Sequence, residues 1–220
     1  MFTGIVEEVG TVVRTHGAGG DLRVVIEAET VLEGAQLGDS IAVSGCCLTV
    51  VALTEGTFAV ELSKETVAKT APRWTVGARV NLERAMGAAG RFGGHIVSGH
   101  VEGVGEVLDV RNEPGAYVVT VRAPGAMGRF FVAKGSVTVD GVSLTLVDVG
   151  GPGGTKPELG ADEFTLWLIP HTLSVTTLGE LKPGSRVNLE PDLIAKYVER
   201  LTLTRDVIRE ETEAQHVAAR

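Results

Sequence analysis

Short runs of β-branched and aromatic residues, separated by turns of Gly, Asp and Pro, dominate the chain. In the first ninety residues these runs come at intervals of roughly 8 to 15 residues, which is typical of short antiparallel strands. The pattern predicts six strands, at residues 4–14, 22–27, 40–44, 48–53, 57–62 and 79–82. Two stretches, "AETVLEG" and "APGAMGRFF", instead favour short helices.

The chain repeats itself. "FTGIVEEVGTV" from residue 2 matches "VSGHVEGVGEV" from residue 97, and "SIAVSGCCLTVV" from residue 40 matches "SVTVDGVSLTLV" from residue 136. "FAVELSKETVAKTAPRWTVGARVNLE" from residue 58 matches "FTLWLIPHTLSVTTLGELKPGSRVNLE" from residue 164, after a longer Gly/Pro-rich turn, "GGPGGTKPELG". This period is too long for a solenoid and predicts two duplicated domains.

Six short strands leave too little chain for two separate sheets in each half, so a small closed barrel is favoured. We therefore expect an all-β fold with two tandem six-stranded antiparallel barrels, at residues 1–90 and 94–192, followed by a helical tail at 193–220. In that tail Ile194, Tyr197, Val198 and Leu201 fall on one face of a helix. The spacing fits packing on the same chain and oligomerisation equally well.

Composition and charge exclude several classes of protein. Apolar residues make up 44% of the chain and charged residues 22%, which excludes a disordered chain. No run approaches the ~20 apolar residues of a membrane helix. The net charge of -8, without a basic stripe, argues against nucleic acid as a partner. The N-terminal "MFTGIVEEVG" lacks the features of a secretory signal, so we expect a cytoplasmic protein.

The two cysteines, Cys46 and Cys47, are adjacent. A disulfide between neighbours closes a strained eight-membered ring, so we expect reduced thiols. No Cys or His pair at zinc-site spacing lies nearby, and we expect no metal. In a strand the two side chains point to opposite faces; Cys46 is expected to pack as a small hydrophobe, while Cys47 fits both a structural and a functional role.

The glycine-rich stretch "GRFGGHIVSGHVEGVG" fits neither common phosphate-binding pattern, and we interpret it as a linker and a barrel turn. His95 and His100 would lie on opposite faces of a regular strand, which does not favour a metal pair. His100 replaces Ile5 of the first copy at the expected start of a strand, and His171 replaces Glu65. A lone His is often only a satisfied polar residue, but it also exchanges protons near neutral pH.

Matching polar residues near strand ends predict two related sites. A six-stranded barrel is filled by side chains, so a small-molecule site is expected at its mouth. Cys47 corresponds to Ser143, and "SKET" corresponds to "IPHT". One site carries Cys47 and Glu65, and its twin carries a different set: Ser143, His100, Asp140 and His171. Two alike but unequal sites fit a reaction in which two like molecules take different roles.

Eight motifs, in order along both halves, resemble the alpha chain of riboflavin synthase from Met1 to about Asp192: "MFTGIVEEVG", "SGCCLTV", "KETV", "GGHIVSGHVEGVGEV", "DGVSLTL", "IPHTL", "TTLG" and "RVNLE". The resemblance implies Greek-key barrels and a C-terminal helix that holds a homotrimer together. It also implies a cofactor-free reaction in which two molecules of 6,7-dimethyl-8-ribityllumazine exchange a four-carbon unit, giving riboflavin and 5-amino-6-(ribitylamino)uracil. Each barrel would bind one lumazine, at a junction between subunits, and lumazine synthase becomes a candidate partner.

The resemblance also implies the substrate-binding residues. The first pocket would use Gly4, Ile5, Val6, Cys47, Leu48, Thr49, Glu61, Leu62, Ser63, Lys64, Glu65 and Thr66. The second would use Gly99, His100, Val101, Ser143, Leu144, Thr145, Trp167, Leu168, Ile169, Pro170, His171 and Thr172, with Lys134 near the shared edge. One motif departs from the family, which often has "IPET" where this chain has "IPHT" with His171.

Six positions are expected to carry the chemistry, three of them also among the substrate-binding residues: Phe2, Cys47, His100, Asp140, Ser143 and Asp192. Phe2 would cover the reacting rings, and His100 would move the proton of the lumazine methyl group. Ser143 or Cys47 would hold the added nucleophile, and the two aspartates would steady charge. Two other functions compete with the enzyme: a non-catalytic lumazine or flavin carrier, and a scaffold built from two barrels. The joint presence of Cys47, Ser143 and His100 favours the enzyme.

Overall fold

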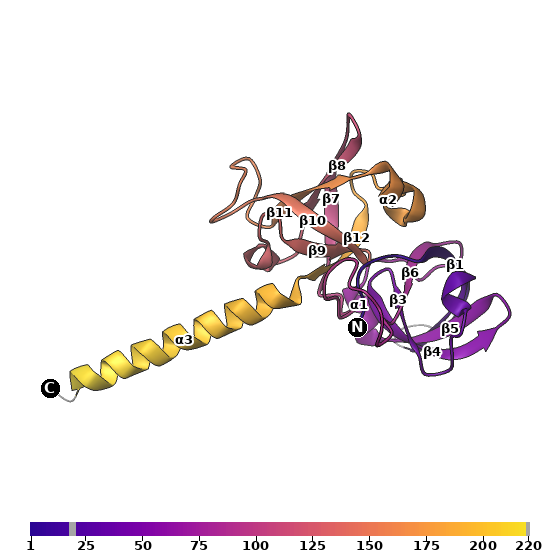
Figure 1. Cartoon of the computed structure of the whole chain (residues 1–220), viewed down its shortest axis with the longest axis horizontal. Coiled ribbons are helices and arrows are strands. Elements are labelled where there is room, and N and C mark those ends of the chain that lie inside the picture. Colours follow the sequence, from indigo (N-terminus) through magenta and orange to yellow (C-terminus); the bar gives the residue numbers. More distant parts are fainter. Residues whose placement is uncertain (18–20, 219–220) are drawn as a thin grey trace.

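The computed structural model describes the backbone of residues 1–17 and 21–218, and the side chains of residues 1–17 and 22–205. In these residues the strands form two closed antiparallel barrels of six strands each, which confirms the predicted fold. Figure 1 shows the barrels side by side, with one long helix leading away from them.

Barrel 1 contains β1 (Glu8–His16), β2 (Asp21–Glu27), β3 (Ser40–Val43), β4 (Cys46–Thr54), β5 (Thr57–Ser63) and β6 (Arg79–Arg84). Barrel 2 contains β7 (Gly103–Glu113), β8 (Ala116–Arg122), β9 (Ser136–Val139), β10 (Val142–Val149), β11 (Glu163–Leu168) and β12 (Arg186–Pro191). In both barrels the strands are neighbours in the same circular order: first, second, fifth, fourth, third and sixth. Non-consecutive strands therefore pair, as in a Greek key. The repeated sequence therefore encodes a repeated topology.

Short helical segments connect the strands. The two stretches that the sequence predicts as helical contain the 3-10 turns η1 (Thr30–Leu32) and η2 (Met127–Phe130). Three segments were not predicted: α1 (Lys64–Lys69), α2 (Pro170–Val175) and η3 (Thr177–Glu180). In α1 the hydroxyl of Ser63 accepts a hydrogen bond from the Thr66 N–H at 3.1 Å, while Pro170 occupies the first turn of α2, so different residues start the same helix in the two copies.

The tail forms α3 (Leu193–Ala218), as predicted, and the last two residues of the expected tail lie outside the described residues. The Asp192 carboxylate accepts a hydrogen bond from the Ile194 N–H at 2.9 Å at the helix start. Figure 1 shows α3 projecting from barrel 2 into open space. Exposed apolar side chains lie along its described part: Ile194, Tyr197, Val198, Leu201 and Leu203.

Matching irregularities bend the strands of the two barrels. The register shifts between Val12 and Arg14 in β1, and between Val107 and Asp109 at the equivalent place in β7. It shifts again in β4 and β10, at residues 50–52 and 146–148. A bulge increases local twist and lets a strand curve around a barrel.

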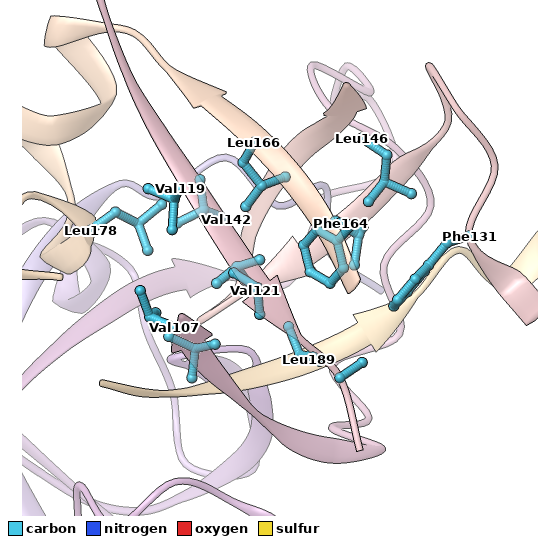
Figure 2. Close-up of a cluster of buried hydrophobic side chains, with 14 of the residues drawn as sticks. Val107, Val119, Val121, Phe131, Val142, Leu146, Phe164, Leu166, Leu178 and Leu189 are labelled. Carbon is cyan, nitrogen blue, oxygen red and sulfur yellow. The ribbon is translucent and has the colours of Figure 1, made fainter. Parts of the chain in front are cut away.

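Each barrel is filled by its own apolar core. Figure 2 shows the core of barrel 2, where Phe131 meets Phe164 edge to face with ring centroids 4.8 Å apart. In barrel 1, Cys46 is one of the buried core residues, as predicted, and burial raises the pKa of its thiol to about 12. Since the interiors are full, ligands have to bind outside them.

The first strand of each barrel begins later than predicted. β1 begins at Glu8 instead of residue 4, and β7 begins at Gly103, so His100 lies in a loop and not at the start of a strand. The backbone N–H groups of these loops bond to buried carboxylates, Thr3 and Gly4 to Glu83, and Ser98 and Gly99 to Glu190. Side-chain acceptors thus replace the neighbouring strand that a sheet would supply.

Candidate active site between the barrels

Two facing hairpin turns form the junction of the barrels. Ser44-Gly45 joins β3 to β4 and Asp140-Gly141 joins β9 to β10, and all four residues have positive φ, as a type I′ turn requires. The turns touch, because a Cβ on Gly45 would lie 2.8 Å from the Gly141 nitrogen. The strand that follows each turn starts at the junction, which brings Cys47 and Ser143 to it.

Reciprocal side-chain hydrogen bonds lock the junction. Asn81 donates to the Asp140 carbonyl at 2.9 Å and accepts from the Thr177 N–H at 2.8 Å. Its twin, Asn188, donates to the Ser44 carbonyl at 2.8 Å and accepts from the Ala71 N–H at 2.6 Å. Both asparagines are buried and use both ends of the amide. The repeated "RVNLE" motif thus supplies the contacts between the repeats.

The loops before β1 and β7 cross between the barrels. Phe2 and Val97 form an isolated antiparallel bridge, with N···O distances of 2.8 and 3.1 Å. From that bridge each loop reaches the other barrel. The Cys47 N–H donates to the Gly99 carbonyl, and the Ser143 N–H donates to the Gly4 carbonyl, both at 2.7 Å. Neither Gly4 nor Gly99 has room for a Cβ there, and both have positive φ.

A pocket of about 420 Å³ lies between the barrels, within the range of roughly 300–1,000 Å³ of small-molecule sites. Barrel 1 lines it with Cys46, Cys47, Glu65, Thr66, Lys69 and Thr70. Barrel 2 lines it with Gly99, His100, Val101 and Glu102. Because it holds a thiol, an imidazole and charged side chains at its rim, the pocket has groups for both hydrogen bonding and proton transfer.

The structure groups the pocket residues differently from the grouping that the family resemblance implies. The resemblance places Gly4–Val6 with Cys47 and Gly99–Val101 with Ser143, whereas the structure places Gly99–Val101 with Cys47 and Gly4 against Ser143. The loops exchange barrels at the bridge between Phe2 and Val97, a long-range pairing that the repeat alone does not reveal. Four pocket residues were not among the expected site residues: Cys46, Lys69, Thr70 and Glu102.

Ser143 has a partner that the sequence analysis did not identify. His95 Nδ1 lies 2.7 Å from Ser143 Oγ, and its Nε2 is buried without a hydrogen-bond partner among the described residues. Burial lowers the pKa of His95, although the charges of Asp192 and Glu190 act in the opposite direction. A neutral imidazole can accept a proton from the serine hydroxyl. Cys47 has no hydrogen bond of this kind among the described side chains.

Two expected catalytic residues lie in places other than those expected. Phe2 is completely buried in a small cluster with Ala42, Val97 and Cys47, so it supports Cys47 from behind instead of covering a ring-binding surface. Asp140 is also completely buried, and it forms an ion pair with Arg73 across the junction. Asp192 starts α3 and is close enough to His95 to affect its pKa.

The remaining expected site residues divide by side-chain direction. Leu48, Leu62 and Leu168 point into the barrel cores, which leaves only their backbones for a ligand. Leu144 is half-buried and packs against the core of barrel 2. Exposed side chains are those of Ile5, Thr49, Glu61, Ser63, Lys64, Glu65, Lys134, Thr145, Trp167, Ile169, Pro170 and His171, while Val6, Thr66, Val101 and Thr172 are half-buried.

In the described part of the chain no three His, Cys, Asp or Glu side chains come together as a metal site. Nor does any helix there have the length and apolar character needed to cross a membrane.

The chain matches the lumazine binding domain model twice, at residues 3–85 and 98–192. It is 45% identical to the riboflavin synthase of Photobacterium phosphoreum, over 92% of this chain and 89% of that one. It is also 45% identical to the riboflavin synthase of Bacillus subtilis, over 91% and 89%. The chain belongs to the riboflavin synthase family. The family's duplicated domain corresponds to the two barrels.

Solved structures support the fold. A crystal structure of LumP complexed with riboflavin has a TM-score of 0.75 and 25% identity, and covers 87% of this chain and 99% of that one. A second LumP structure, complexed with 6,7-dimethyl-8-(1'-D-ribityl) lumazine, has a TM-score of 0.74 and 24% identity. This chain and LumP thus share the two-barrel architecture.

Proposed function

We propose that the protein makes riboflavin from two molecules of 6,7-dimethyl-8-ribityllumazine, with 5-amino-6-(ribitylamino)uracil as the second product. One lumazine gives up the four carbons of its dimethylated ring edge, and the other receives them as a new ring. The four-carbon unit that one molecule gains is lost by the other, so the two products together contain all the atoms of the two substrates. The reaction therefore needs no added oxidant or reductant.

The observation that carries this proposal is the pocket between the barrels, which joins Cys47 and Thr66 of barrel 1 to His100 of barrel 2. Its size fits one bicyclic ring with a ribityl chain. Glu65 and Lys69 at the rim supply an acceptor and a donor for the hydroxyls of that chain. The second lumazine binds at the twin position, against Ser143 and the Gly4–Val6 loop, with Trp167–Thr172 as the counterpart of Glu61–Thr66.

The two positions have different groups for proton transfer. At the first, His100 takes a proton from the acidic methyl group of one lumazine, and Cys47 contacts the ring. At the second, the Ser143 hydroxyl holds the nucleophile that adds to the lumazine ring, and His95 acts as the base for that hydroxyl. The charge of Asp192 favours the protonated imidazole of His95. Asp140 acts only by holding the junction between the barrels through its ion pair with Arg73. Holding two rings in contact supplies much of the rate, since orientation is worth about 7–11 kcal/mol.

We further propose that the active form is a cytoplasmic homotrimer in which α3 joins the subunits and places the two kinds of pocket opposite each other. The exposed apolar residues of α3 support an intermolecular role. Lys196 of α3 also forms an ion pair with Glu102 at the rim of the pocket, which links the helix to the site. Lumazine synthase, which would supply the substrate, is the proposed partner.

A carrier is the second candidate function, because solved LumP structures share this fold and contain a lumazine or a flavin. The experiment is to incubate the purified protein with 6,7-dimethyl-8-ribityllumazine alone, in chelator, and to follow riboflavin by chromatography. One riboflavin formed for every two lumazines consumed supports the enzyme. Tight binding of lumazine without turnover would make the protein a carrier, and the absence of both would exclude both functions.

A further inference from the structure

Two buried glutamates occupy equivalent positions in the barrels, Glu83 in β6 and Glu190 in β12. Both carboxylates accept hydrogen bonds from the loop that precedes the first strand of their own barrel. Glu83 accepts from the Thr3 N–H and hydroxyl at 2.6 and 2.7 Å and from the Gly4 N–H at 2.9 Å. A carboxylate is suited to this place because it only accepts, and all of these hydrogen-bond partners donate.

Glu190 accepts one bond more than Glu83. The Ser98 N–H and hydroxyl donate to Oε1 at 2.7 Å, and the N–H groups of Gly99 and His100 donate to Oε2 at 2.9 Å. In barrel 1 the residue equivalent to His100, Ile5, donates to the Thr3 hydroxyl instead, at 3.2 Å. The additional bond to Glu190 therefore falls on the residue that faces the pocket with an imidazole.

The bonds of Glu190 are coupled to Cys47 through one peptide. The Gly99 N–H donates to Glu190, while the Gly99 carbonyl accepts from the Cys47 N–H at 2.7 Å. Polarised hydrogen bonds in such a chain strengthen one another. Glu190 thus holds the backbone of His100 directly and that of Cys47 through Gly99, although Glu190 itself does not line the pocket.

We infer that Glu190 is a positioning residue for the proposed reaction: from behind the 98–101 loop it fixes His100 in the pocket that Cys47 also lines, without lining that pocket itself. This inference rests on the function proposed above. Glu83 is the matched position, since it holds the equivalent loop with the same chemistry but has no bond to His100 or its neighbours.

The test compares Glu190→Gln with Glu83→Gln in the full-length protein. A Gln retains one oxygen and turns an N–H donor toward the remaining donors, so part of each set of bonds is lost. For Glu190→Gln we expect kcat to fall by about 10- to 100-fold, because misplacement by 1 Å can cost about 100-fold, while the KM for 6,7-dimethyl-8-ribityllumazine changes by less than about threefold. The NMR signal of the His100 ring should shift in Glu190→Gln and stay unchanged in Glu83→Gln.

An unshifted His100 signal in Glu190→Gln, or a kcat that stays at the wild-type value, would overturn the inference. So would a loss of kcat that only follows the fraction of unfolded protein. If Glu190→Gln does not fold, Glu190→Asp retains the charge on a shorter side chain, and the same two readouts apply. If the wild type makes no riboflavin, the proposed function fails, while the His100 signals still test whether Glu190 positions this loop.

Discussion

The guanidinium of Arg73 in barrel 1 pairs with the carboxylate of Asp140 in barrel 2, and Asp140 is completely buried. The equivalent turn residue in barrel 1 is Ser44, so this ion pair breaks the symmetry of the repeat. Asp140 also accepts a hydrogen bond from the Asn188 N–H at 2.8 Å. A buried charge therefore contributes to the contact that holds the two barrels in place.

The ion pair predicts a pH-dependent stability. Burial raises the pKa of Asp140 to about 6, against the opposing effects of Arg73 and the Asn188 N–H. Between pH ~4 and ~6 the folded protein retains a proton that the unfolded chain releases, so the free energy of unfolding falls as the pH rises through this window. We expect the wild type to lose about 3 kcal/mol relative to Asp140→Asn between pH 4 and 7, measured by urea unfolding. Parallel pH profiles for the two proteins would contradict this.

Removing Arg73 tests the same pair from the other side. Arg73→Met leaves Asp140 buried without its counter-charge, which we expect to cost about 3–5 kcal/mol at pH 8. The cost should be smaller at pH 5, where Asp140 is protonated. The double variant Arg73→Met/Asp140→Asn should recover most of the loss at pH 8. Equal losses at the two pH values would mean that Arg73 acts through packing alone.

The crossed loops predict an unusual sensitivity at Gly99. A Cβ at this residue would lie 2.7 Å from Cys47 Cβ and 2.9 Å from the Phe2 ring, at a φ of +80°. Gly56 is a matched control, because its φ is +82° and no atom beyond its two neighbours in the chain lies within 4 Å of its Cβ position. Gly56→Ala should cost about 1–2 kcal/mol from the backbone alone. Gly99→Ala should cost more and weaken riboflavin binding, whereas equal costs would argue against the close approach.

The hydrogen bond between His95 and Ser143 predicts the acid side of the pH–rate profile. Protonation of His95 removes its ability to accept the serine proton, and burial lowers the pKa of His95 from its usual 6.5. We expect kcat to fall as the pH drops below ~6.5. This acid limb should be absent in His95→Gln, whose rate at pH 8 should be about 100- to 10,000-fold lower than that of the wild type. An unchanged acid limb in the variant would assign it to another group.

The exposed face of α3 predicts an oligomer that depends on it. Replacing Tyr197 and Leu201, which are 64% and 69% exposed, with Glu should dissociate the proposed trimer in sedimentation experiments without unfolding the barrels. The control is Arg200→Glu, which changes an exposed polar residue of the same helix. It is better suited than Glu at Thr202 and Leu203. A trimer that persists in the double variant would show that α3 does not hold it together.

Local patterns were enough to predict the strands of barrel 1 and the directions of the two cysteines. Alternating and β-branched runs placed most strand boundaries of barrel 1 within two residues, and they placed Cys46 inside the barrel and Cys47 outside it. These features depend on near neighbours in the chain, which the sequence displays directly.

The site was harder to predict, because its contacts join distant segments. The exchange of loops depends on the bridge between Phe2 and Val97, and on glutamates about 80 to 90 residues away in sequence from the loops they hold. One signal was present: the glycines before His95 in "GGH". A Cβ on Gly94 would lie 2.7 Å from Ser143 Cβ, so only Gly lets this segment pass close to Ser143 and deliver His95 to it.

A structure of the protein with riboflavin bound would show whether the ligand binds in the pocket that both barrels build. We expect the flavin ring to lie between Cys47 and Thr66 of barrel 1 and the Gly99–Val101 loop of barrel 2. A ring held by Cys47 together with the Gly4–Val6 loop, or one bound away from the junction, would contradict this expectation.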